Sequence, residues 1–277
     1  MRDFIARPEH GIVWISGASS GIGRALALKL ADEGYKVAVT ARSHEKLVEL
    51  QGEASGLSGS IIVLDGDVSD AEDMEHVLAS IEYEHGTLGM AILNAGVCLP
   101  VHAEELDRAD FEKSFAVNLS GVVNCLLPAI RHMKAKGQGQ IAIVSCVTGY
   151  GGLPAGAAYG ATKAALINMA ESLKFDLDKM GIRIQLVSPG FVDTSATGTN
   201  AFPMLTPMSA AEAARQVAAG LKSQAFEIAF PRRSTTMMKL ARLLPYGAYF
   251  PLVNRVTGWR QRPPLAGRHP ATPHPAE

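Results

Sequence analysis

Short apolar runs alternate with longer amphipathic segments along most of this chain. Seven runs are apolar and rich in β-branched residues, which predicts buried strands over residues 12–16, 36–41, 61–64, 90–93, 141–145, 184–187 and 226–230. Six helix-length segments lie between them, over residues 22–34, 43–50, 70–84, 108–136, 157–180 and 210–222. Continuously apolar strands that alternate with helices are typical of a parallel sheet covered on both faces. We therefore expect an α/β fold, a single doubly wound domain with about seven parallel strands.

The last part of the chain follows a different pattern. Residues 235–256 are apolar with scattered Arg and Lys, and a helix over about 235–244 would carry Met238, Leu240, Leu243 and Leu244 on one face. This segment can close a substrate pocket, form a subunit contact or lie on a membrane. The basic residues are few, so we favour the first two and do not expect membrane contact. Residues 259–277 are rich in Pro and Arg without a period, which predicts a disordered tail after a domain of residues 1–258.

Composition narrows the functional classes. With 277 residues, of which 47% are hydrophobic, the chain can bury a sizeable core, and its net charge of −1 gives no reason to expect nucleic acid as a partner. Cys98, Cys125 and Cys146 have no paired spacing, which argues against a disulfide framework or a metal site. We expect Cys98 and Cys125 to be small buried hydrophobes. The chain has neither a signal-peptide pattern nor an apolar run of about 18 residues, so we expect a cytoplasmic protein.

A glycine-rich turn follows the first predicted strand. It reads Ser-Gly-Ala-Ser-Ser-Gly-Ile-Gly over residues 16–23 and leads directly into a helix. Glycines allow a tight turn close to a pyrophosphate, and the helix N-terminus offers free N–H groups and a positive dipole end. The turn therefore predicts the dinucleotide site of a Rossmann fold, formed by Gly17, Ser19, Ser20, Gly21, Ile22 and Gly23. The alternative is a glycine-rich turn without a ligand.

The end of the second strand indicates which dinucleotide binds. An acidic residue at this point would hold a ribose 2′-hydroxyl, whereas a basic one accommodates a 2′-phosphate. The chain has no carboxylate there, and Arg42 and Ser43 both suit a phosphate. We therefore favour NADP(H) over NAD(H) as the cofactor. The alternative is that Arg42 is a solvated residue at the start of the next helix.

Two further strand ends carry residues suited to the same cleft. Asp67 and Val68 follow the third strand, and the carboxylate can accept a hydrogen bond from an adenine amino group. Asn94, Ala95 and Gly96 follow the fourth strand, where small residues let the backbone line the cleft. We expect all five residues to contact the cofactor.

A tyrosine and a lysine share one face of a predicted helix. Tyr159 and Lys163 stand at positions i and i+4, so their side chains are neighbours. An ammonium beside a phenol favours the phenolate, so we expect Lys163 to lower the pKa of Tyr159. Tyr159 is then a candidate proton donor or acceptor near neutral pH. The alternative is a surface pair without a chemical role.

Taken in order, these motifs resemble the short-chain dehydrogenase/reductase family in its single-domain form. The resemblance covers residues 12–230 and includes the glycine-rich turn, Asn118 in Phe-Ala-Val-Asn-Leu-Ser-Gly, Tyr-x-x-x-Lys and the Ser-Pro-Gly segment at 188–190. It implies an NADP(H)-dependent oxidoreductase that transfers a hydride between the nicotinamide and a ketone, an aldehyde or a secondary alcohol.

The resemblance also implies roles for individual residues. Tyr159 would be the general acid and base, and Lys163 would lower the pKa of Tyr159 and hold the nicotinamide ribose. Asn118 would hold a water in a proton relay, unless it is a polar kink in its helix. The nicotinamide would be contacted by Pro189, Gly190, Val192 and Thr194. The alternative for Thr194 is a helix N-cap that contacts no ligand.

The chain departs from the family at one catalytic position. The family has a serine 13 residues before the tyrosine, where this chain has Cys146. Ser145 cannot replace that serine without a local bulge, because successive strand residues point to opposite faces. A thiol is a weaker donor than a hydroxyl, so four readings stay open. The enzyme is slower or retuned, Thr148 supplies the hydroxyl, the protein is a non-catalytic NADP-binding sensor, or Cys146 is a redox-sensitive thiol.

Two expectations concern substrate and assembly. Residues 195–209 suit a lid, and their apolar side chains suit an apolar substrate: Phe202, Met204, Leu205 and Met208. By analogy with the family, the predicted helices 108–136 and 157–180 would pair two subunits in a homodimer or homotetramer. Their apolar stripes are equally compatible with packing on the sheet.

Overall fold

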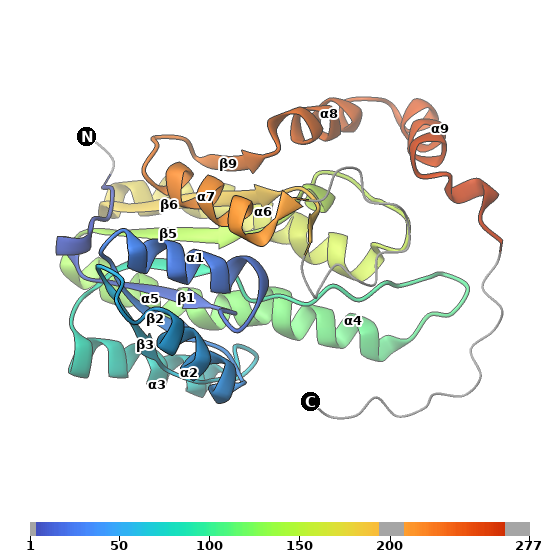
Figure 1. The fold of residues 1–277 in the computed structure, drawn as a ribbon. Coiled ribbons are helices and arrows are strands. Elements are labelled where there is room, and N and C mark those ends of the chain that lie inside the picture. Colours follow the sequence, from blue (N-terminus) through green and yellow to red (C-terminus); the bar gives the residue numbers. More distant parts are fainter. Residues whose placement is uncertain (1–3, 194–207, 264–277) are drawn as a thin grey trace.

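A seven-stranded parallel sheet forms the centre of the protein (Figure 1). The computed structural model describes residues 4–193 and 208–263. The strands are β1 Ile12–Ser16, β2 Lys36–Thr40, β3 Ser60–Val63, β4 Leu88–Leu93, β5 Gly139–Val144, β6 Ile182–Pro189 and β9 Glu227–Phe230. All seven correspond to predicted strands, and the sheet order is β3-β2-β1-β4-β5-β6-β9. The predicted α/β doubly wound class is confirmed.

Helices cover both faces of the sheet, as strand periodicity requires. Val13 and Ile15 of β1 face one core, which contains apolar residues of α1 Gly21–Asp32, α2 His44–Glu53 and α7 Ala210–Leu221. Ile12 and Trp14 face the opposite core, with residues of α3 Ala71–Ser80, α5 Gly121–Lys136 and α6 Ala157–Leu177. Both faces are apolar because successive side chains alternate between two buried layers.

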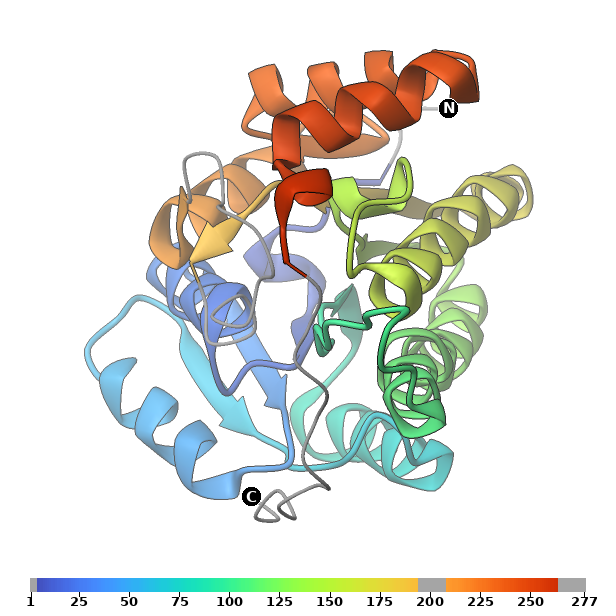
Figure 2. The ribbon, with the colours of Figure 1, turned by 90° about the vertical axis from the view of Figure 1, so that its right-hand side faces the viewer.

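The strand order reverses beside β1, which has β2 on one side and β4 on the other. After β1 the chain continues to one face of the sheet, and after β4 it continues to the opposite face. A doubly wound sheet opens a crevice at such a point. The segments that follow β1, β2, β4, β5 and β6 therefore meet at one edge of the sheet (Figure 2).

The helix predicted over 108–136 is interrupted. It consists of α4 Arg108–Phe115, a π-helical turn Ala116–Ser120 and α5. Asn118 lies in this turn, so its segment does form a local irregularity. By length and composition the whole helix is apolar enough to cross a membrane, although core helices pass the same test. Here α5 packs on β4 and α3 and belongs to the core.

The C-terminal region contains more structure than the pattern predicts. α8 spans Arg232–Arg242, three residues earlier than expected, and α9 spans Tyr246–Thr257. α9 was not predicted, because Pro251 lies inside it and breaks the helical pattern. At the start of the predicted tail a 3-10 helix covers Trp259–Gln261, and the guanidinium of Arg262 lies 4.2 Å from the Trp259 ring centroid. Residues 264–277 lie outside the described residues, so their disorder stays a prediction.

Only the end of the expected lid falls within the described residues. Met208–Ser209 forms β8, which pairs in parallel with β7 Val192–Asp193. The Ser209 hydroxyl then accepts a hydrogen bond from the Glu212 backbone N–H and caps α7. Residues 195–207 and the predicted contact Thr194 lie outside the described residues.

Candidate active site

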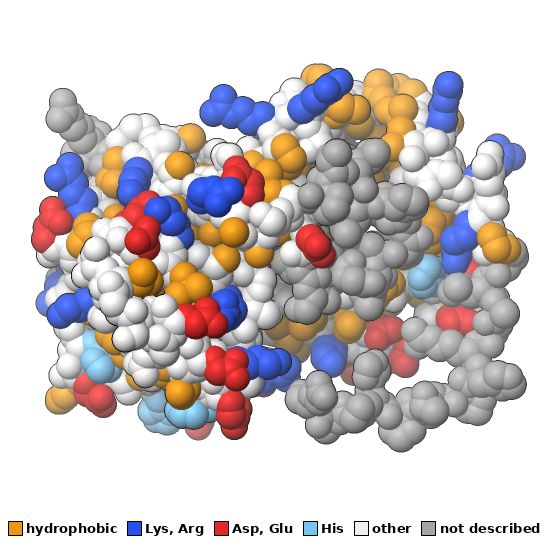
Figure 3. Space-filling model, in the orientation of Figure 1, with side chains coloured by type: hydrophobic (Ala, Val, Ile, Leu, Met, Phe, Trp, Pro, Cys, Tyr) orange, Lys and Arg blue, Asp and Glu red, His pale blue; other side chains and the backbone are white. Residues whose placement is uncertain are grey.

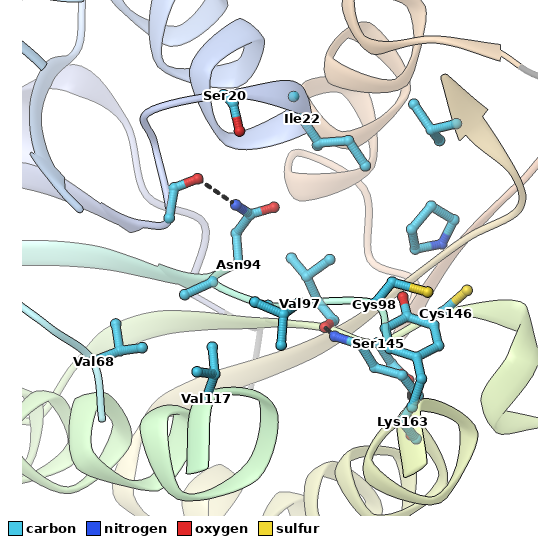
Figure 4. A pocket seen from close by; sticks show the side chains of 18 of the residues that line it. Ser20, Ile22, Val68, Asn94, Val97, Cys98, Val117, Ser145, Cys146 and Lys163 are labelled. Atoms are coloured by element: carbon cyan, nitrogen blue, oxygen red, sulfur yellow. Dashed lines mark hydrogen bonds between the residues drawn. The ribbon is translucent and has the colours of Figure 1, made fainter. Parts of the chain in front are cut away.

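A cavity of about 890 Å³ opens at the carboxyl edge of the sheet. Most of the predicted site residues line it: Gly17, Ser19, Ser20, Gly21, Ile22, Arg42, Ser43, Asp67, Val68, Asn94, Ala95, Gly96, Cys146, Tyr159, Lys163, Pro189, Gly190 and Val192. Gly23 and Asn118 lie behind this lining. Figure 4 shows Ser20 and Ile22 in one part of the site and Cys98, Cys146 and Lys163 gathered in another.

The glycine-rich turn fits tightly against the end of β4. Gly17 has φ +70°, and a Cβ added to it would lie 2.6 Å from the Cα of Ala95. A Cβ on Gly23 would lie 2.3 Å from the Gly17 carbonyl oxygen. The Asn94 side-chain amide donates to the carbonyls of Ser16 and Gly17, at 3.2 and 3.0 Å. The turn therefore depends on glycine for both conformation and space.

The N-terminus of α1 opens on the cavity. Ser20 is its N-cap, and the Ser20 side chain makes no capping hydrogen bond. Ser19, Ser20 and Ile22 all line the cavity wall. The partial positive charge of the helix end is thus available to an anionic group.

Basic residues gather where β2 ends. Arg42 is exposed and lines the cavity together with Ser43, as predicted. Lys46, in the first part of α2, lines the same end and was not predicted. Glu45 lies there too, and its carboxylate accepts a hydrogen bond from the Ser43 hydroxyl at 3.3 Å.

Asn118 holds the segment that follows β4. Its side-chain oxygen accepts a hydrogen bond from the Val97 N–H at 2.7 Å, and its amide nitrogen donates to the Val97 carbonyl at 2.8 Å. The same nitrogen donates to the Thr162 hydroxyl on α6 at 3.3 Å. Asn118 is fully buried, and its amide links α6 to the segment that follows β4, which we call the β4 extension. A role in a proton relay stays a prediction.

Tyr159 and Lys163 meet at the deep end of the cavity. The Lys163 Nζ lies 5.5 Å from the Tyr159 ring centroid and donates to the Val144 carbonyl at 2.9 Å. Burial lowers the pKa of Lys163 to about 8. Burial, together with the neighbouring thiols of Cys146 and Cys98, raises the pKa of Tyr159 well above its ordinary value.

The expectation that the pKa of Tyr159 lies below its ordinary value is therefore wrong for this structure. Desolvation disfavours the phenolate more than the neighbouring ammonium favours it. The ammonium is itself buried and bonded to a backbone carbonyl. Tyr159 consequently keeps its proton near neutral pH and is a hydrogen-bond donor.

Cys146 faces Tyr159. Its thiol lies close enough to the Tyr159 hydroxyl to raise the pKa of the phenol, and only 7% of the residue is exposed. Ser145 is engaged elsewhere, because its hydroxyl donates to the Lys163 carbonyl at 2.8 Å. Ser145 and Cys146 thus point to different partners, as alternation along an extended chain requires, and Cys146 is the group beside the phenol.

The chain is similar to known proteins in sequence and in fold. A sequence model of the family described as short chain dehydrogenase matches residues 11–202. An uncharacterized oxidoreductase of Myxococcus xanthus is 32% identical over 241 residues, which are 87% of this chain and 95% of that protein. The chain belongs to the short-chain dehydrogenase family.

Two further short-chain dehydrogenase relatives have stated activities. The 3-oxoacyl-(acyl-carrier-protein) reductase FabG of Staphylococcus aureus is 33% identical over 184 residues, 66% of this chain and 75% of that protein. The alcohol dehydrogenase of Thermococcus sibiricus, solved with 5-hydroxy-NADP, has a TM-score of 0.72 at 28% sequence identity. The matched region covers 79% of this chain and 95% of that chain. The chain is accordingly a short-chain oxidoreductase.

In this short-chain dehydrogenase one cavity residue, Cys98, was expected in the core, and another, Thr148, was one of the open alternatives of the sequence. Cys98 is not a core residue: it lines the cavity, and burial beside Cys146 raises its pKa to about 11. Only Cys125 is fully buried in the core as expected. Thr148 also lines the cavity, and its buried hydroxyl has no hydrogen-bond partner within residues 4–193 and 208–263. The signal for Cys98 was its position two residues after Gly96, in the segment that leaves β4.

Proposed function

We propose that this short-chain dehydrogenase is an NADP(H)-dependent oxidoreductase of ketones, aldehydes or secondary alcohols, with Tyr159 as its general acid and base. One observation carries the proposal. Tyr159, Cys146 and Lys163 lie together in a cavity whose lining also includes the glycine-rich turn and Arg42. A proton donor and a nucleotide cradle within one cavity are what hydride transfer to a carbonyl requires.

The residues present fit a dinucleotide. A Cβ on Gly17 would collide with Ala95, so glycine is required for the turn to lie against the end of β4, with the Gly17 backbone in the cavity wall. The N-terminus of α1 has no side-chain cap and suits a pyrophosphate. Pro189, Gly190 and Val192 line the cavity and are proposed to contact the nicotinamide. When bound, this cofactor supplies or accepts the hydride.

We favour NADP(H) because of the charge at the end of β2. Arg42, Ser43 and Lys46 offer two cations and a hydroxyl to a 2′-phosphate. Glu45 is the acidic residue at this end, and it accepts a hydrogen bond from Ser43. The binding of 5-hydroxy-NADP by the Thermococcus sibiricus relative supports the same choice.

The protonation of Tyr159 suits carbonyl reduction at neutral pH. Because its pKa is raised, Tyr159 holds a proton that it can donate to a developing alkoxide. The Lys163 ammonium, with a pKa of about 8, is charged at neutral pH and favours the phenolate that remains. Asn118 keeps Val97 and α6 in place around this pair.

Cys146 would take the position of a polarising donor. Its S–H is a weaker donor than a hydroxyl, so Tyr159 would carry more of the stabilisation of the substrate oxygen. The buried Thr148 hydroxyl is a second candidate for this hydrogen bond. We assign the main role to Cys146, because its thiol lies close to the Tyr159 hydroxyl.

The surroundings favour an apolar substrate and a cytoplasmic setting. Apolar residues around the catalytic end of the cavity include Val97, Pro100, Leu153, Pro154 and Phe191. The FabG and alcohol dehydrogenase relatives suggest a 3-oxoacyl group or a simple secondary alcohol as the substrate class. The free cysteines fit a reducing compartment.

The second candidate function is a non-catalytic NADP-binding sensor. Cys146 favours it, because this residue stands at a catalytic position of the family. The test is to titrate NADPH and then measure its oxidation with a panel of apolar ketones and aldehydes. Turnover by the wild type supports the enzyme. Intact NADPH binding with no turnover by the wild type, but turnover by Cys146→Ser, supports the sensor.

Tyr159→Phe tests the assigned mechanism. Loss of the general acid should lower kcat by about 10²–10⁴-fold, while the Kd for NADPH changes little. Comparison of NADPH with NADH for wild type and Arg42→Ala tests the cofactor choice. Full activity of Tyr159→Phe would refute the mechanism, and equal use of both nucleotides by the wild type would refute the NADP(H) preference.

A further inference from the structure

Large apolar side chains are exposed along α8 and the start of α9. Met237, Leu240, Leu243, Leu244, Tyr246 and Phe250 form what we call the C-terminal apolar surface, and each is between 38% and 80% exposed. In Figure 3 hydrophobic side chains gather over α8 and α9, with Lys and Arg beside them. A contiguous exposed apolar patch marks an interaction site more often than a neutral surface.

The surface follows helical geometry. Met237, Leu240 and Leu244 recur at the spacing of one helix face, which Arg233 continues toward the N-terminus. At the start of α9 the rings of Tyr246 and Phe250 stack with centroids 5.7 Å apart. The result is an apolar stripe with an arginine at one end and two aromatic rings at the other.

The charge of this region has one sign. Residues 231–263 contain no Asp or Glu, and they contain the seven cations Arg232, Arg233, Lys239, Arg242, Arg255, Arg260 and Arg262. Lys239 pairs with Glu227, and Arg262 pairs with Glu104. The other five are exposed, and none of them has an ion pair within the described part of the chain.

We propose that the C-terminal apolar surface docks on an anionic lipid bilayer. An exposed apolar stripe flanked by uncompensated arginines is the pattern of an interfacial amphipathic helix. Self-pairing of this surface would bring two sets of unpaired cations together, so charge opposes a second copy as occupant. The sequence pattern favoured pocket closure or a subunit contact. The exposure of these side chains argues against pocket closure, and the five unpaired cations argue against contact with a second copy.

Docking would bring the substrate cavity close to the membrane. The Tyr249 hydroxyl of α9 donates to the Gly152 carbonyl at 2.8 Å. Gly152 precedes Leu153 and Pro154, which line the cavity. α9 is thus joined to the cavity wall and would hold that wall near the lipid headgroups.

Vesicle flotation of the full chain tests the proposal. Vesicles of phosphatidylcholine and phosphatidylglycerol in equal parts should bind the protein at least about tenfold more tightly than phosphatidylcholine alone. Arg232→Glu/Arg233→Glu/Arg242→Glu should weaken binding to the anionic vesicles by about 100-fold or more. Leu240→Asp/Leu243→Asp should weaken binding to them by at least about tenfold, because it removes apolar area from the docking face.

A matched charge reversal provides the control. Lys36→Glu/Lys134→Glu/Lys136→Glu changes the net charge equally at exposed positions by the amino ends of β2 and β5. Its binding should stay within about threefold of the wild type. Circular dichroism and NADPH titration establish that each variant is folded. In the wild type, hydrogen exchange over residues 237–250 should slow when anionic vesicles are added.

Three results would overturn the proposal. The first is equal binding to the two kinds of vesicle or to neither. The second is equal loss of binding in the control and the arginine variant. The third is a wild type that forms an oligomer and binds no vesicles, together with a monomeric Leu240→Asp/Leu243→Asp variant. This result would make the surface a subunit contact.

Discussion

Tyr159 and Lys163 show how burial acts on two neighbouring groups in opposite directions. The neutral form of each is favoured, so the phenol pKa rises and the ammonium pKa falls to about 8. Their charge attraction does not offset this, because the loss of solvation on burial is the largest effect on both pKa values. At the residue scale, the site is therefore a protonated phenol beside an ammonium that titrates close to neutral pH.

A pH profile of reduction should reveal Lys163. With a pKa of about 8, below its ordinary 10.5, the ammonium is charged below pH 8 and neutral above it. We expect kcat/KM for NADPH to be flat up to about pH 8 and then to fall about tenfold per pH unit, because kcat/KM reports groups of the free enzyme. The phenol of Tyr159 ionises well above this range. A profile that stays flat to about pH 10 would contradict a role for the Lys163 charge.

Substitutions at Cys146 and Thr148 should separate their contributions. Cys146→Ser should raise kcat about tenfold, because a hydroxyl is the better donor, and Cys146→Ala should lower it about tenfold. Thr148→Val and the control Cys98→Ser should stay within about threefold of the wild type. The measurement is kcat for reduction at saturating substrate. A larger loss in Thr148→Val than in Cys146→Ala would transfer the role to Thr148.

Two backbone irregularities shape the site at the scale of whole elements. Gly17 turns the chain from β1 into α1 with a left-handed conformation, directly against Ala95. Asn118 lies in the π-helical turn before α5, where its amide reaches Val97 and Thr162. Both features hold the segment after β4 against a neighbouring element. Gly17 lets the start of α1 lie against Ala95, and Asn118 links Val97 to α6. The glycine-rich turn and the β4 extension therefore form one continuous wall.

Gly17→Ala should damage that wall. The added Cβ would lie 2.6 Å from the Ala95 Cα at φ +70°, so the turn must move. We expect a loss of about 1–3 kcal/mol in the free energy of unfolding and at least about tenfold weaker NADPH binding. Urea unfolding and fluorescence titration measure the two effects.

Gly52→Ala is the control for this prediction. Gly52 lies in α2 with open space around it, and alanine there should stabilise the helix by about 0.5–1 kcal/mol. Unchanged NADPH binding by Gly17→Ala would contradict the assigned role of the turn.

At the scale of the molecule, exposed apolar residues lie on more than one surface. One is the C-terminal apolar surface. Another includes Leu127 of α5 and Phe175 of α6, which are 53% and 75% exposed. Both helices cover the same face of the sheet and turn these side chains outward. This second surface fits the subunit pairing that the family resemblance suggests.

Leu127→Glu/Phe175→Glu should therefore convert the protein to a monomer. We expect the wild type to sediment as a homodimer or homotetramer, because burying these side chains removes apolar surface from water. Analytical ultracentrifugation measures the change. Val48→Glu, on the opposite face of the sheet, should leave the assembly intact. A monomeric wild type would refute the pairing.

The sequence by itself determined the fold class, the strands of the sheet and part of the cavity lining. Alternating apolar runs placed all seven strands, because in a doubly wound domain period and length alone separate buried strands from helices. The glycine-rich turn and the strand ends named many of the residues that line the cavity, because the carboxyl ends of parallel strands meet at one edge. These features are local, so a linear pattern contains them.

Only the tertiary structure decided the electrostatics and the exposed surfaces. The pKa of Tyr159 depends on burial and on Cys98, which sequence spacing does not reveal. The helical pattern of Leu240 and Leu243 predicted a face but not its surroundings, and that face is exposed. Asn118 is fixed by Val97 and Thr162, which come from two other segments. The burial of a side chain and its contacts depend on segments that are distant in the sequence, so only the folded structure reveals them.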